Sequence, residues 1–238
     1  MFQRLNNTTV SFLPNNTDAT AVATVSPANY ALASTVAVIC TGTLIYNALV
    51  ILAFVKDPSI RQPFMFYLLN VSLCDFGLAG ISMTGFVWFT LSPAASATYC
   101  PYYNFLDKIF TIGTGYTVLL VSLDRAFSLF FPLRYRYFRS NRSTLAVCGL
   151  TWLGITGLCG PYVVMDALWY RSMTLPCVIN GPAQKGYSLV MEFAAYDAPA
   201  VLVLLCTTVI VVKLYGRSQL RRLIKGTGKK MPITGSVQ

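Results

Sequence analysis

An acidic and a basic residue lie side by side at the end of a long apolar run, within Ser122–Arg136 (SLDRAFSLFFPLRYR). Asp124 and Arg125 are followed by an aromatic stretch, Pro132 and several arginines. An ion pair in a membrane helix is costly, and it is kept where it has a partner or a function. Two interpretations fit. Arg125 forms a charged switch with Asp124, or it only extends to the lipid interface as other arginines at helix ends do.

Two further acids, Asp75 and Asp107, also interrupt apolar stretches. Asp107 lies eighteen positions before Arg125, which is five helical turns, so the two share a helix face about 27 Å apart. A buried carboxylate needs a cationic partner. That partner is either an external ligand or a lysine of the chain itself, Lys108 or Lys185, and the sequence leaves both open.

Asp75 lies deep within its apolar run, where an ionisable side chain usually faces the interior of a helix bundle. Asn47, Asn70 and Thr114 are the polar residues that could hydrogen-bond to it from neighbouring helices. The alternative is a polar cluster that only joins helices, with contacts worth about 0.6–2 kcal/mol each.

The elements that position these residues are membrane helices. The chain has 238 residues, of which 55% are hydrophobic and 11% charged, and its mean hydropathy is +0.58. A soluble domain carries about 25% charged residues. Five apolar runs reach the roughly 20 residues that a crossing needs, without the strict alternation of a barrel strand. We therefore predict an all-α integral membrane bundle over 29–215, with spans at 29–55, 64–91, 102–131, 144–169 and 187–215.

Basic residues are concentrated on one side of these spans. They lie in the first and third connections and in the tail 216–238, whereas the other side has only Arg4, Lys108, Arg171 and Lys185. By the positive-inside rule, the N-terminus is extracellular and the basic tail cytoplasmic. Because the basic clusters alternate with spans, we expect them to contact anionic lipid headgroups and not nucleic acid.

The predicted extracellular tail 1–28 contains acceptor sequons for N-glycosylation at Asn6, Asn7 and Asn15. Two further matches, at Asn70 and Asn141, fall in a predicted span and a predicted cytoplasmic loop, and we discount them.

Seven cysteines cannot all pair within the chain. Five lie within predicted spans, where cysteine is typically a small buried hydrophobe. Cys100 and Cys177 are predicted to face the oxidising exterior, where a bond between them would tie the third span to the second outer loop. The chain has no histidine and no Cys-x-x-Cys pair, so we expect no metal site, no cofactor and no enzymatic activity, although a Ser–Lys or Asp pair stays open.

Several short motifs follow one another in order, each on its own predicted span. They are Gly42–Asn47 (GTLIYN), Leu68–Asp75 (LLNVSLCD), Asp124–Ala126 (DRA) followed by Pro132–Tyr135 (PLRY), Trp152 with Pro161, and Pro199. Cys100 lies twenty-five positions before Arg125. In this order and spacing, the chain resembles the rhodopsin-like (class A) G protein-coupled receptors.

The resemblance implies a seven-helix receptor fold and a set of site residues. Asp107, Thr111 and Glu192 would contact an extracellular ligand. Asp124 and Arg125 would form the activation switch, and Asn47, Asp75 and Thr114 would form a sodium-binding polar core. Leu133 and Arg134 would contact a heterotrimeric G protein, and Cys100–Cys177 would be the outer disulfide. The acids among the ligand contacts, Asp107 and Glu192, slightly favour a basic ligand, and both an amine and a peptide stay open.

The sequence also departs from the family pattern. Ala126 replaces the usual aromatic residue, and Thr207 stands where many members have tyrosine. The sixth-helix CWxP and seventh-helix NPxxY motifs are not found before Gln238. The expectation is therefore a plasma-membrane receptor that is truncated after its fifth helix. The alternative is a non-signalling interaction protein that pairs with a full-length receptor, and a transporter is disfavoured because no paired half-repeats are visible.

Overall fold

The computed structural model describes residues 26–91, 100–170, 179 and 181–227, and this part of the chain contains helices and no strands. The prediction of an all-α membrane bundle is confirmed. Five helical segments are long and apolar enough to cross a bilayer: Pro27–Lys56, Pro63–Leu91, Cys100–Phe130, Asn141–Trp169 and Lys185–Gln219.

The first and third spans are single α-helices, α1 (Pro27–Lys56) and α4 (Cys100–Phe130). The helix α1 begins where Ser26 caps it: the Ser26 hydroxyl accepts a hydrogen bond from the Asn29 amide at 3.3 Å, and Pro27 occupies the first turn. Proline suits that position because its missing N–H would have no partner there.

The other three spans each contain a π-helical turn. The second consists of α2 (Pro63–Gly77), η3 (Leu78–Met83) and α3 (Thr84–Leu91). The fourth consists of α6 (Asn141–Met165) and η4 (Asp166–Tyr170), and the fifth of α7 (Lys185–Glu192), η5 (Phe193–Asp197) and α8 (Ala198–Thr227). The π turn η5 ends two residues before Pro199, where the missing backbone donor of proline disturbs the regular hydrogen bonding of the helix.

Two short elements lie in connections that the sequence did not predict to be helical. The turn η2 (Pro58–Ile60) follows α1, and the helix α5 (Pro132–Phe138) follows α4. The main helix of the fifth span also continues to Thr227, past the predicted span boundary at residue 215.

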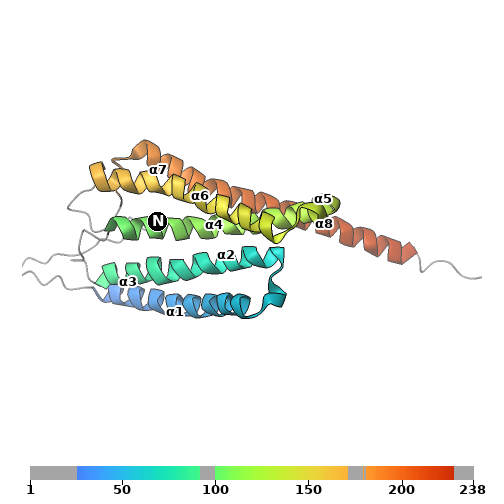
Figure 1. Cartoon of the computed structure of the whole chain (residues 1–238), viewed down its shortest axis with the longest axis horizontal. Coiled ribbons are helices and arrows are strands. Elements are labelled where there is room, and N and C mark those ends of the chain that lie inside the picture. The colour runs from blue at the N-terminus through green and yellow to red at the C-terminus, as the bar shows by residue number, and fades with distance from the viewer. Residues whose placement is uncertain (1–25, 92–99, 171–178, 180, 228–238) are drawn as a thin grey trace, which may run out of the picture.

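The helix α4 is the central element of the bundle. It packs against α2, α6 and α8, whereas α1 packs against α2 and α3 (Figure 1). In the same view α5 lies at one end of the bundle, and the C-terminal half of α8 projects beyond that end. In the most apolar stretch of each of the three middle spans, 28% of the residues are buried. The corresponding share is 11% in the first span and 6% in the fifth. The outer helices therefore present apolar surface that suits lipid or further helices.

A buried apolar cluster lies where α4, α6, α7 and η5 meet. Its members are Ile109, Ile112, Ile155, Cys159, Tyr162, Val163, Ile179, Met191 and Ala195. This cluster fixes the N-terminal half of α4 against the fourth and fifth spans, and so it positions Asp107.

Candidate functional site

The polar core lies between α2 and α4. The Thr114 hydroxyl donates a hydrogen bond to Asp75 Oδ1 at 3.0 Å, so these two predicted residues are brought together. Asn47 is not: its side-chain amide donates to the Thr43 carbonyl of its own helix at 2.9 Å. One carboxylate and one hydroxyl are short of the six or so oxygen ligands that hard cations take, so these residues alone do not form a sodium site.

Asn70 joins three spans through its hydrogen bonds instead of bonding to Asp75. Its amide nitrogen donates to Thr117 Oγ1 at 2.7 Å, and its amide oxygen accepts from Trp152 Nε1 at 2.8 Å. Thr117 in turn donates to the Gly113 carbonyl at 2.7 Å. Because Asn70 is only 6% exposed and both its polar atoms are bonded, it acts as a buried link among α2, α4 and α6.

Asp107 lies near the N-terminal end of α4 and pairs with its neighbour. Lys108 Nζ lies 3.6 Å from Asp107 Oδ2, with side chains that are 30% and 24% exposed respectively. Of the two candidate lysines, Lys108, which lies on the same helix as Asp107, therefore neutralises this acid. Lys185 instead lies exposed at the first residue of α7.

Thr111 and Glu192 are the other two predicted ligand contacts. Thr111 is half-buried on α4, one turn after Asp107, and Glu192 is exposed at the last residue of α7. Within the described residues, no hydrogen bond or ion pair joins either of them to Asp107. The three residues are near the same end of the bundle, but the structure does not bring them into one bonded cluster.

At the opposite end of α4, Asp124 and Arg125 have different partners. The Tyr135 hydroxyl of α5 donates to both Asp124 carboxylate oxygens, at 3.0 and 3.2 Å. The guanidinium of Arg125 lies over the Phe64 ring of α2, 3.5 Å from Cζ to the ring centroid. Among the residues described, the ion pairs within 4.0 Å do not include Asp124–Arg125. In this conformation the expected ion pair is therefore not formed, because Asp124 is bonded to Tyr135 and Arg125 lies on the Phe64 ring.

A cavity of about 370 Å³ lies beside the Asp124–Tyr135 contact. It is lined by residues of α2, α4, α5 and α6 and by Arg139 directly after α5; the helical residues are Tyr67, Leu120, Leu123, Asp124, Phe127, Tyr135, Phe138, Ser143, Thr144 and Val147. Partial burial raises the pKa of Tyr135 above its usual value, and the hydrogen bond to the Asp124 carboxylate is the second cause of this rise. The phenol therefore stays protonated and able to donate at neutral pH.

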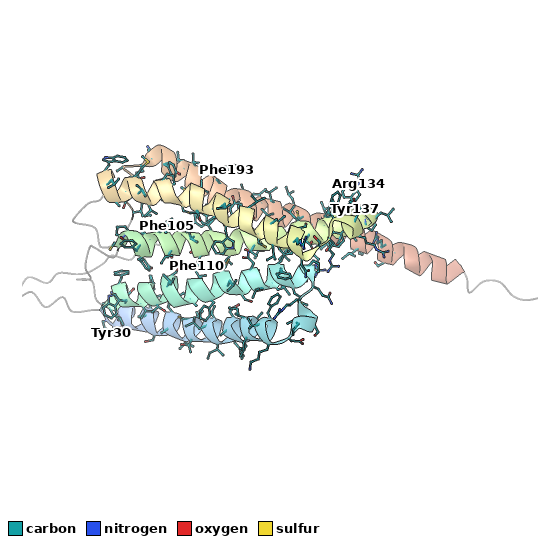
Figure 2. All side chains as sticks on the ribbon, in the orientation of Figure 1. Tyr30, Phe105, Phe110, Arg134, Tyr137 and Phe193 are labelled. Atoms are coloured by element: carbon teal, nitrogen blue, oxygen red, sulfur yellow. The ribbon has the colours of Figure 1, made fainter. Side chains whose placement is uncertain are left out.

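The short helix α5 presents exposed side chains at the same end. Leu133 is 84% exposed and Tyr137 is 85% exposed, and Arg134 is exposed as well. Figure 2 shows Arg134 and Tyr137 together at this end, far from Tyr30 and Phe105 at the other. The two predicted partner contacts, Leu133 and Arg134, are therefore accessible.

A family model described as 7 transmembrane receptor (rhodopsin family) matches residues 46–230. The chain belongs to this family. The matched residues run from α1 to just past α8 and contain the polar core, both ends of α4 and the helix α5. The resemblance drawn from the motifs is thus confirmed, and this rhodopsin-family chain is a multi-pass membrane protein.

Individual receptors show lower similarity. The chain is 24% identical to muscarinic acetylcholine receptor M3 of Rattus norvegicus, over 75% of this chain and 31% of that one. It is 27% identical to melanopsin-B of Gadus morhua, over 75% and 30%, and 26% identical to histamine H4 receptor of Rattus norvegicus, over 74% and 46%. The chain therefore spans less than half the length of each of these relatives.

Some predicted residues of this rhodopsin-family chain lie outside the described residues. Asn6, Asn7, Asn15 and Cys177 are among them. Cys100 is 2% exposed and disulfide-bonded, but its pairing with Cys177 stays a prediction. Sequence reasoning also missed Phe64 and Tyr135, the partners of the two switch residues. The only signal for Tyr135 was its place in the PLRY motif.

Proposed function

We propose that this chain is part of a receptor that binds an extracellular ligand near Asp107 and transmits a conformational change to a heterotrimeric G protein. The observation that carries the proposal is the arrangement of α4. This one helix has a partly exposed acid toward one end and an exposed arginine toward the other, with the Thr114–Asp75 hydrogen bond between them. A rigid helix that joins two accessible ends can couple events at one to events at the other.

The proposed ligand site faces the extracellular side and consists of Asp107, Thr111 and Glu192. Two of its three members are acids, which favours a ligand with a positive charge. Two of the relatives are named as receptors for acetylcholine and histamine, both of which carry a positively charged nitrogen. Melanopsin-B, which matches equally well, is not named for an amine, so an amine and a basic peptide both fit.

The proposed transducing end faces the cytoplasm and consists of Asp124, Arg125, Leu133 and Arg134. We infer two packings of this end whose balance a ligand shifts by binding one of them better. In the packing seen here Tyr135 holds Asp124 and Phe64 holds Arg125. In the other, Arg125 leaves the Phe64 ring and becomes available to the G protein, which also contacts the exposed side chain of Leu133.

Nucleotide exchange on purified heterotrimeric G proteins tests this proposal. The full 238-residue chain is reconstituted in lipid nanodiscs, and exchange is measured with and without acetylcholine, histamine and basic peptides. We expect exchange above that of empty nanodiscs, and Leu133→Ala lowers it severalfold. Leu153→Ala is the matched control, because Leu153 is 71% exposed on α6, away from α5.

Exchange that equals that of empty nanodiscs under every condition would contradict the proposal. In that case, co-purification with a full-length receptor would examine the alternative of a non-signalling interaction partner. None of the contacts within the described part of the chain favours that alternative.

A further inference from the structure

Asp107 and Lys108 form a charge pair that is still open to a ligand. At 3.6 Å, the ammonium and the carboxylate attract each other without forming a hydrogen bond of ordinary length. Both side chains keep about a quarter to a third of their surface exposed. Each group therefore has free hydrogen-bonding capacity, because an ammonium has three donors and a carboxylate accepts about four hydrogen bonds.

The two charges are held by different walls of the bundle. Asp107 and Thr111 are a turn apart on one face of α4. Lys108 instead interacts with the hydroxyls of Tyr162 on α6 and Tyr196 on η5.

The walls around Lys108 are fixed by further contacts. Tyr162 stacks on Tyr187 with ring centroids 5.4 Å apart and an interplanar angle of 8°, and its hydroxyl lies 3.1 Å from Ser188 Oγ. The Tyr116 hydroxyl donates to the Ala194 carbonyl at 2.7 Å, which holds η5 against α4 beside Tyr196. The ammonium position is thus built by packing from three helical segments.

We propose that the ligand of this site is a small zwitterion, with its ammonium on Asp107 and its carboxylate on Lys108. This rests on the proposed function, since it names the ligand class of the same site. The short distance between the two protein charges matches a ligand that carries both charges on one carbon, as an α-amino acid does. The four charges then alternate in sign around a square, and each charged group lies beside two opposite ones.

Among ligands with a positive charge, the same geometry favours those that also carry a carboxylate over those that carry the ammonium alone. Such a cation would compete with Lys108 for Asp107 and leave the lysine ammonium in a membrane span without its anionic partner. Breaking a partly buried ion pair by removing one partner is costly. A zwitterion leaves the local net charge at zero, so selectivity arises from the penalty on the wrong ligand as well as from contacts with the right one.

Three probes with one hydrocarbon scaffold test the charge preference: L-phenylalanine, 2-phenylethylamine and 3-phenylpropionate. They carry both charges, the ammonium alone and the carboxylate alone. Binding is measured on the full chain in nanodiscs, by the shift in melting temperature over millimolar concentrations of each probe. We expect L-phenylalanine to bind at least about tenfold more tightly than either of the other two.

The variant Lys108→Met should remove this preference. It should bind L-phenylalanine about tenfold more weakly and 2-phenylethylamine more tightly than the unmodified chain does. The matched control is Lys185→Met, the same substitution at the exposed lysine that begins α7. This variant should bind all three probes with unchanged affinity. Asp107→Asn should instead favour 3-phenylpropionate.

Two results would overturn the proposal. One is tighter binding of 2-phenylethylamine than of L-phenylalanine to the unmodified chain, which would leave the proposed cationic-ligand receptor intact. The other is the absence of a shift with any of the three probes. Since the assay contains no G protein, failure of transduction and failure of the charge preference are observed separately.

Discussion

The guanidinium of Arg125 lies over the ring of Phe64, with Cζ 3.5 Å from the ring centroid. This contact joins the C-terminal end of α4 to the first turn of α2. A cation over an aromatic face is worth about 0.5–2 kcal/mol, more when it is shielded from water. Since no acid pairs with Arg125 in the described residues, this ring is the contact that positions its charge.

Phe64→Leu should therefore free Arg125 while keeping an apolar side chain on α2. We expect a loss of about 0.5–2 kcal/mol in the free energy of unfolding and a rise in ligand-independent nucleotide exchange. The control is Phe76→Leu, which changes an exposed phenylalanine farther along the same helix. Equal effects of the two substitutions would show that the ring of Phe64 does not restrain Arg125.

Tyr135→Phe should remove the hydroxyl that bonds both oxygens of Asp124. Because a hydrogen bond to a charged group contributes about 1.5–3 kcal/mol, we expect a loss in that range or somewhat below it, given the partial exposure of the contact. Thermal unfolding in nanodiscs measures the change. Tyr137→Phe is the matched control, since Tyr137 lies 85% exposed on the same short helix.

The raised pKa of Tyr135 adds a prediction about alkaline pH. The folded state holds the phenolic proton more tightly than the unfolded state. The contribution of the Tyr135–Asp124 hydrogen bond to the free energy of unfolding is therefore fully present below about pH 10. It is lost as pH rises through the higher pKa of the folded state. The stability difference between the unmodified chain and Tyr135→Phe should therefore shrink above about pH 10. A difference that stays constant into that range would contradict the assigned hydrogen bond.

The spans were predictable because a bilayer crossing demands a long apolar run, and nothing else in the sequence has that length. The shared face of Asp107 and Arg125 also followed, since helical geometry alone places residues eighteen positions apart. Partner choice did not follow from the sequence. Asn47 and Asn70 both looked like partners for Asp75, yet one bonds its own helix and the other bonds Thr117 and Trp152.

The reason is that partner choice depends on how each helix is rotated about its axis. That rotation is set by packing against several neighbours at once, which no local pattern encodes. The π turns were missed for a related cause, because an extra residue in a turn leaves the apolar composition unchanged. Tyr135 was missed because α5 looked like a polar loop, and only its fold brings the hydroxyl back to Asp124.

The buried link through Asn70 should be energetically coupled to Trp152. Asn70→Ala leaves the indole N–H without its acceptor, at a cost of about 1–3 kcal/mol. In a double-mutant cycle with Trp152→Phe, we expect a coupling energy of about 0.6–1.7 kcal/mol, between the average and the maximum measured for such bonds in a membrane protein. A coupling indistinguishable from zero would show that the two side chains contribute independently.

Close packing of α2 on α4 depends on Gly77, where an added methyl group would collide with the ring of Phe110. That ring also packs edge-to-face on Trp152, with centroids 6.1 Å apart, so it has little freedom to move away. Gly77→Ala should therefore lower the free energy of unfolding by about 1–3 kcal/mol, as overpacking does in other cores. Gly42→Ala is the matched control on α1, because nothing lies within 4 Å of the added carbon there. That control should be neutral or slightly stabilising, since alanine favours a helix more than glycine does. Thermal unfolding of both variants in nanodiscs measures the difference, and equal melting temperatures would contradict the close approach of Phe110 to α2.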